Sequence, residues 1–116
     1  METTRVHQDL IGKSYEEIKQ ALVIVEDGGG CCGWSDYDVT TIPEGVDVTK
    51  LVLKDCVQID YDEEYSNRVV LNFVFSDGKG ELVLGYDLSA GSGSGWSYGA
   101  YVTLSLGERE LATASW

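Results

Sequence analysis

The chain has 116 residues, of which 43% are hydrophobic and 24% are charged, as is typical of one folded domain rather than a disordered or fibrous protein. Twenty acidic residues against eight basic ones give a formal net charge of −12 at pH 7. Proteins that bind nucleic acid or anionic membranes use Lys and Arg to neutralise phosphate. The charge therefore argues against both partners and permits a basic partner, a cation or plain solubility.

No targeting signal is evident in the sequence. The first residues, METTRVHQDLIGKSYEE, lack the apolar segment of a signal peptide. The longest apolar run, ALVIV at 21–25, is far shorter than the roughly 20 residues that cross a bilayer. Three cysteines, an odd number, suit a reducing compartment better than a disulfide framework. We therefore expect a soluble, cytoplasmic protein.

The segment SYEEIKQAL predicts one short helix near the N-terminus. Ser14 stands three residues before Glu17, which is the capping-box spacing, so we expect the serine to cap the helix. Ile18 and Leu22 are four residues apart and share one helical face. The β-branched run that follows, near 22–26, should leave the helix as a strand.

Between 51 and 61 the sequence alternates as a half-buried strand does. Apolar side chains occupy one parity and mostly polar ones the other. Cys56 falls on the polar parity, so we expect it to face a second layer rather than the main core. Asp55 interrupts the apolar parity, which indicates a bulge or a turn. A further short strand is expected near 37–41.

Later segments predict an antiparallel meander in the second half of the chain. The turn SDGKG contains the Asp-Gly pair of a tight hairpin. The segments are RVVLNFVF at 68–75, ELVLGYDL at 81–88 and YGAYVTLSL at 98–106. With the earlier strands they predict a single α+β domain over residues 1–116, mainly an antiparallel β-sheet of five to seven strands with one short N-terminal helix. Residues 1–9 carry no such pattern and are candidates for a frayed end.

Nucleophilic and metal chemistry find little support in the sequence. The one histidine, His7, would have to serve any catalytic arrangement from a polar N-terminal segment, so we expect no enzyme activity. Cys31 and Cys32 are adjacent, which rarely lets both reach one tetrahedral ion, and Cys56 stands at no zinc-like spacing from them. We expect no metal and no cofactor. A disulfide from either member of the doublet to Cys56 stays open.

The acidic residues allow a further interpretation as a cation site. Asp36 with Asp38, or the acids at 60 and 62–64, could hold calcium, although the spacing of a calcium loop is missing. An ordinary solvated acidic face is the simpler interpretation of both groups. A phosphate ligand is not expected, because the glycine-rich stretches GGGCCG and GSGSGW carry no Lys and the net charge opposes it.

Two glycine-rich loops carry aromatic residues where a core is least able to bury them. GGGCCGWSDYD at 28–38 and GSGSGWSYG at 91–99 both place Trp and Tyr beside Gly and Ser. Trp and Tyr contribute much of the binding energy of protein interfaces. Packing of these rings over the end of the sheet and stacking against a sugar remain as alternatives. The predicted partner-binding residues are Trp34, Asp36, Tyr37, Asp38 and Trp96.

Three stretches of the sequence bear on its origin: LIGKSYEEI near the start, the Cys31–Cys32 doublet, and GWSYGAYVTLSL after the glycine- and serine-rich loop. In these stretches the chain resembles a family of small uncharacterised proteins encoded by tailed bacteriophages and their prophages. The resemblance implies a phage context, and with it the cytoplasm of a bacterial host cell. It implies no known activity.

These observations lead us to expect a non-enzymatic acidic binding protein that engages a bacterial host protein through an acidic, aromatic-bearing surface. The partner would be basic or DNA-binding, and an acidic mimic of DNA is one variant of this hypothesis. We expect neither direct nucleic-acid binding nor a membrane, and the oligomeric state stays open. Two alternatives remain: a small-ligand or cation-binding module that uses the glycine-rich loops, and a self-associating virion component.

Overall fold

The computed structural model describes the backbone of residues 1–116 and all side chains except that of Asp62. Its strands are β1 (Glu2–Arg5), β2 (Leu22–Asp27), β3 (Gly33–Val39), β4 (Val52–Glu63), β5 (Ser66–Ser76), β6 (Glu81–Ser92), β7 (Tyr101–Leu106) and β8 (Arg109–Ser115). The helix is α1 (Tyr15–Ala21), and the short 3-10 turns are η1 (Gln8–Leu10) and η2 (Val48–Lys50).

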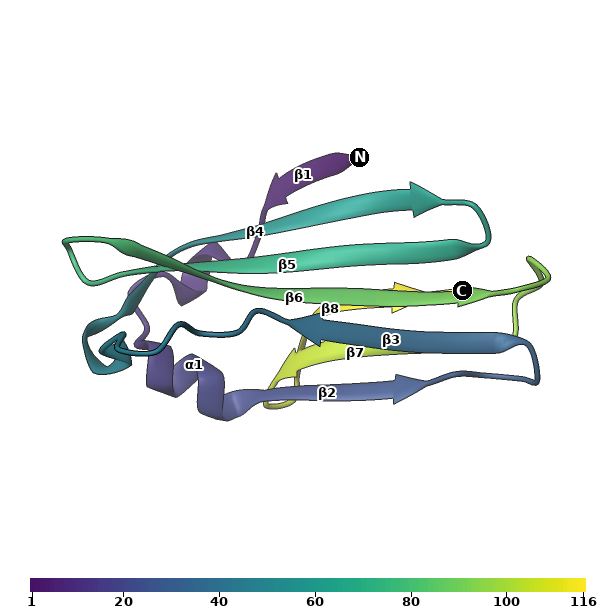
Figure 1. Ribbon diagram of the computed structural model, residues 1–116, viewed down its shortest axis with the longest axis horizontal. Helices are drawn as coiled ribbons and strands as arrows, with labels where there is room; N and C mark the ends of the chain where they lie inside the picture. The colour runs from purple at the N-terminus through teal and green to yellow at the C-terminus, as the bar shows by residue number, and fades with distance from the viewer.

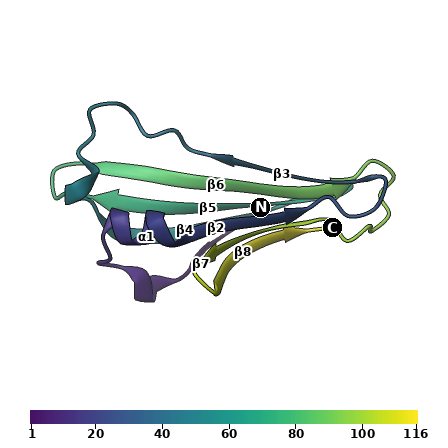
Figure 2. The same ribbon diagram turned by 90° about the horizontal axis from the view of Figure 1, so that it is seen from below.

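The strands form two antiparallel sheets that lie face to face in an elongated sandwich, 47 × 28 × 25 Å (Figures 1 and 2). Five strands make the first sheet, in the order β1-β4-β5-β6-β3, and three make the second, in the order β2-β7-β8. The predicted fold class, α+β with mainly antiparallel strands and one short N-terminal helix, is confirmed.

The core lies between the sheets and is built chiefly on β5 and β6. From Val69 to Phe75 every second side chain of β5 is buried, and Leu71, Phe73 and Phe75 are buried completely. The Phe73 ring stacks on Phe75, with 6.3 Å between ring centroids, and meets Tyr86 of β6 edge-on at 6.0 Å. Apolar side chains of β7 and β8 close the core from the second sheet. The opposite face of β5 and β6 is thereby left to solvent.

Helix α1 begins where the capping pattern predicts. Ser14 Oγ accepts a hydrogen bond from the Glu17 amide at 3.2 Å, and its hydroxyl donates to the Glu17 carboxylate at 3.1 Å. The helix buries Tyr15 and Ile18 and then passes directly into β2, as the β-branched run predicts.

A β-bulge in β4 reverses the prediction for Cys56. The register of β4 against β5 shifts between Leu53 and Asp55, where the sequence indicates a bulge or a turn. The extra residue moves the inward face of β4 to the other parity. Cys56 therefore pairs with the buried Phe73 and is itself fully buried in the core. The expectation that Cys56 faces a second layer rather than the main core is wrong. The bulge adds one residue, so the side chains after it point to the opposite face from the one that simple alternation predicts.

The chain leaves the meander after β6. β5 and β6 are antiparallel neighbours, as expected, and β4 pairs with the other side of β5. β7, the third strand of the predicted meander, instead crosses to the second sheet and pairs with β2 and β8. β1 and β8 were not predicted from the sequence, and they bring the strands within residues 1–116 to eight rather than five to seven. β1 (ETTR) is polar throughout, yet it pairs with β4 and so extends the first sheet. The crossing at residues 93–100 makes the fold a sandwich rather than one sheet.

The residues that follow β1 are held against β8. Arg109 of β8 donates to both carboxylate oxygens of Asp9, at 2.6 and 2.8 Å, and to His7 Nδ1 at 3.2 Å. Because Nδ1 accepts, His7 Nε2 carries the proton and donates to the Leu111 carbonyl at 2.7 Å. The hydrogen bond from Arg109 lowers the pKa of Asp9 to about 2. His7 is thus a structural residue of this network.

Truncating Phe73 should destabilise the fold strongly. Phe73→Ala removes a fully buried ring that touches both Phe75 and Tyr86, and we expect a loss of about 3–5 kcal/mol in the free energy of unfolding, measured by urea denaturation. The control is Val83→Ala on the outer face of β6, where the side chain is 45% exposed and the expected loss is below about 1 kcal/mol. Equal losses for the two variants would contradict this placement of the core.

The Asp9–Arg109 pair should make stability depend on acid pH. The carboxylate has its pKa lowered from 3.8 to about 2 by folding, so its contribution is present above pH 4 and is lost as the pH falls through about 2. Asp9→Asn should therefore be less stable than the native chain near neutrality, and the gap should close toward pH 2. Unfolding curves between pH 2 and pH 7 measure it. In an Arg109→Gln background, Asp9→Asn should cost less stability at every pH in this range. An unchanged cost would contradict the pairing.

Candidate functional site

The central feature of the candidate site is a line of three side chains on β3. Trp34, Asp36 and Asp38 have the same parity in this strand, so they project from one side of the first sheet. Their partners across the ladder are, in the same order, Gly91, Ser89 and Asp87 of β6. The residues between those partners, Leu88 and Ala90, are buried in the core. The line therefore lies on the outer face, away from the second sheet. Three of the five predicted site residues come together here.

The two aspartates also satisfy the backbone of β3, which is the last strand of its sheet. The Thr40 amide donates to the Gly85 carbonyl, so the alternating ladder turns the amides of Tyr37 and Val39 away from β6. Asp36 Oδ1 accepts from the Tyr37 amide at 2.8 Å, and Asp38 Oδ1 accepts from the Val39 amide at 3.0 Å. Acids on such an edge also oppose pairing with a strand of another molecule.

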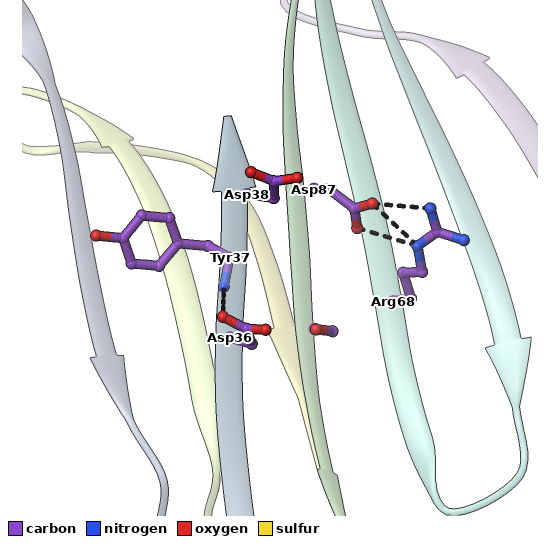
Figure 3. A pocket seen from close by; sticks show the side chains of 6 residues that line it. Asp36, Tyr37, Asp38, Arg68 and Asp87 are labelled. Carbon is purple, nitrogen blue, oxygen red and sulfur yellow. Dashed lines mark hydrogen bonds and ion pairs between the residues drawn. The ribbon is translucent and has the colours of Figure 1, made fainter. Parts of the chain in front are cut away.

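Beside this line, Arg68 of β5 is already paired. Its guanidinium donates to both oxygens of Asp87, with Nε at 3.0 Å from Oδ1 and Nη2 at 2.8 Å from Oδ2 (Figure 3). It also lies 4.5 Å from the centroid of the Tyr61 ring, and the bond to Asp87 raises the pKa of Arg68. Because Asp87 neutralises this cation, the carboxylates of Asp36 and Asp38 remain as excess negative charge.

A shallow hollow of about 300 Å³ opens on the same outer face. Gly85 of β6 lines it, and a Cβ added there would lie only 2.7 Å from Asn72 Oδ1 and 3.0 Å from Thr40 Oγ1. The residues around it are Asp38, Thr40, Ile59, Tyr61, Arg68, Val70, Asn72 and Asp87. A smaller hollow of about 160 Å³ adjoins it and reaches Asp36 and Ser89. The acids of β3 thus form the rim of an open, polar depression.

Trp34 lies across the backbone of β6 at one end of the line. A Cβ added at Gly91 would stand 2.6 Å from Trp34 Cζ2 and 2.6 Å from the Tyr65 carbonyl oxygen, so the indole needs a glycine beneath it. The indole remains 40% exposed. Trp34 is therefore held in place on one side and open to a partner on the other.

The other two predicted residues lie apart from this line. The Tyr37 ring has the opposite parity and points away from Arg68 and Asp87 (Figure 3). Trp96 is 72% exposed and belongs to the β6–β7 loop, beside Gly95, which lies against the Tyr65 ring. Neither Trp34 nor Trp96 is buried over the end of the sheet. Arg68 and Asp87 were not predicted from the sequence, because their pairing depends on the register of β5 against β6.

The remaining sequence candidates have structural surroundings of their own. Asp60 accepts a hydrogen bond from Gln58, and Glu63 accepts one from Ser66, while the expectation for Asp62 lies outside the described side chains. Within those side chains, three or more His, Cys, Asp or Glu residues nowhere gather as metal ligands would.

The three cysteines occupy two different environments, and all of them are free thiols among the described side chains. Burial raises the pKa of the Cys56 thiol to about 12, so it stays protonated and unreactive in the core. Cys31 and Cys32 are exposed in the β2–β3 loop. A disulfide from either of them to Cys56 would have to draw an exposed loop residue and a core residue together.

Comparison with known proteins adds no relative: no family model, no curated protein and no solved structure matches the chain. Within the part of the chain that the structure describes, no helix has the length and apolar character needed to cross a membrane.

The contact between Trp34 and Gly91 can be tested directly. Gly91→Ala should push the indole off the sheet and lower the free energy of unfolding by about 1–3 kcal/mol, since the new methyl also meets the Tyr65 carbonyl. In a background with Trp96→Phe and Trp116→Phe, the emission of Trp34 should shift to the red and be quenched more strongly by iodide. Gly93→Ala, where a methyl meets no atom within 4 Å, is the control. Identical spectra for the two variants would refute the contact.

Proposed function

We propose that this protein is a non-enzymatic acidic binding domain and that its acidic face binds a basic segment of a partner protein. The acidic face comprises Trp34, Asp36 and Asp38 on β3 with Asp87 and Arg68 beside them. The observation that carries the proposal is the line of an exposed indole and two unneutralised carboxylates on one face of an edge strand. Such a surface offers an apolar anchor next to charges of one sign.

Physical reasons favour a protein partner over a small molecule. The depression beside the acids is open and shallow, whereas small ligands are usually bound in enclosed, mostly apolar pockets. Tryptophan is among the residues that contribute most to protein interfaces. A net charge of −12 would also attract a basic protein at long range and speed its association. The two carboxylates would then pair with Lys or Arg of the partner.

The resemblance to proteins of tailed bacteriophages guides the choice of partner. It supports a bacterial host protein, basic or DNA-binding, in the cytoplasm of the host cell. A protein that binds DNA presents the positive surface that the acidic face requires. This context is part of the proposal, and the binding surface itself does not depend on it.

The test compares two variants of equal charge. Asp36→Asn with Asp38→Asn keeps the acceptors for the β3 amides and removes two charges from the acidic face. Glu16→Gln with Glu108→Gln removes two charges from exposed positions on α1 and the β7–β8 turn. A partner captured from bacterial lysate on the native chain is purified, and its Kd for each variant is measured by calorimetry at two salt concentrations.

We expect the variant of the acidic face to bind about tenfold or more weakly, with a smaller dependence on salt, and the control to lose less than about threefold. Trp34→Ala should weaken binding while leaving the salt dependence unchanged. Equal loss in the two charge variants would mean that net charge alone drives binding. Unchanged binding in both would remove the acidic face from the interface.

A further inference from the structure

The loop between β2 and β3 holds two adjacent cysteines in a defined turn. The Gly33 amide donates to the Gly30 carbonyl at 3.1 Å, which closes a four-residue turn with Cys31 and Cys32 at its centre. Two further bonds attach the turn to the β6–β7 loop: the Gly30 amide donates to the Tyr98 carbonyl at 2.9 Å, and the Gly93 amide donates to the Cys32 carbonyl at 3.3 Å. The doublet is thus fixed at both ends.

The glycines of this loop are needed for its close packing. An added Cβ at Gly29 would lie 2.2 Å from the Tyr98 carbonyl oxygen, and one at Gly33 would lie 2.2 Å from the Gly28 carbonyl oxygen. Gly29 also has a positive φ of 74°, which suits glycine. The glycines on either side of the doublet therefore let the loop backbone lie directly on its neighbours, which orders the turn that presents the two thiols.

The two thiols lie together on the surface. Cys31 Sγ and Cys32 Sγ are 3.6 Å apart, and both side chains are exposed. A disulfide requires about 2 Å between the sulfur atoms, so these are not positioned as one. Two metal–sulfur bonds of about 2.3 Å at a tetrahedral angle span about 3.8 Å. The observed separation is therefore close to one edge of a metal–thiolate tetrahedron.

We propose, in place of the expectation from the sequence that no metal binds, that Cys31 and Cys32 form a two-thiolate site for one thiophilic d¹⁰ cation of the Zn²⁺ and Cd²⁺ class. The turn supplies two ligands, and no third Cys, His or carboxylate group joins them among the described side chains, so water or another small ligand occupies the other two positions. Each ion displaces two thiol protons, which pass to the buffer, and the two thiolates balance its charge. The net charge of −12 favours a cation at this loop over an anion.

The protons of the pair give this site a pH dependence. The two sulfur atoms are 3.6 Å apart, so binding of one ion to both releases both thiol protons. Because the cation binds only the deprotonated sulfurs, its affinity should increase as the pH rises toward that of the thiols. A site made of carboxylates would show no such increase above neutral pH.

The experiment titrates the fully reduced protein with Cd²⁺ and follows the thiolate-to-metal charge-transfer band in the ultraviolet. We expect the band to saturate at one ion per chain, to survive a large excess of Ca²⁺, and to appear at lower Cd²⁺ as the pH is raised. Cys31→Ser and Cys32→Ser should each weaken binding by at least about tenfold. Cys56→Ala is the matched control and should leave the titration unchanged, since Cys56 is buried in the core.

Three results would overturn the proposal. A band that persists in the Cys31→Ser, Cys32→Ser double variant would show that other groups bind the ion. Displacement of Cd²⁺ by Ca²⁺ would assign the binding to surface carboxylates. Saturation at one ion per two chains would mean that a second copy completes the site. Circular dichroism of each variant confirms that the fold is retained, which we expect because both cysteines are exposed.

Discussion

Burial of one face of β5 and β6 is the constraint on which the rest of this molecule depends. Phe73, Phe75 and their buried neighbours fill the space between the two sheets, and the period of two then turns every intervening residue outward. The outer face is polar for that reason. Arg68 and Asp87 occupy it because each lies one residue from a buried position. The candidate site is therefore formed by outward-facing residues of the same sheet whose inward-facing residues form the core.

The unequal sizes of the sheets explain how the edges are treated. Three strands cannot cover five, so α1 also packs on the first sheet, where Tyr15 meets Phe75 of β5 edge-on, and Leu10 joins the same core (Figure 2). β1 and β3 are the edge strands of the first sheet, and β2 and β8 are those of the second. Asp36 and Asp38 satisfy amides at the free edge of β3, which is a structural role. Their carboxylates still face solvent, so a role in binding requires no change in the fold.

Glycine shapes the surface wherever two segments must approach closely. Gly85 lines the outer hollow, Gly91 lies under Trp34, and Gly29 lets the cysteine loop lie on Tyr98. A methyl group at any of these positions would collide with its neighbours. The surface features of this protein therefore depend on positions where glycine has no side chain as much as on the side chains that are present.

The sequence alone determined the fold class, the helix with its Ser14 cap, the bulge near Asp55 and the alternation of β5 and β6, because each follows from local chemistry and periodicity. It also named Trp34, Asp36 and Asp38 as binding candidates, although it predicted a glycine-rich loop where β3 aligns them on one face. The burial of Cys56, the place of β7 in a second sheet and the pairing of Arg68 with Asp87 became evident only in three dimensions. Those outcomes depend on register and on the packing of distant strands, which bring together residues that no local pattern relates.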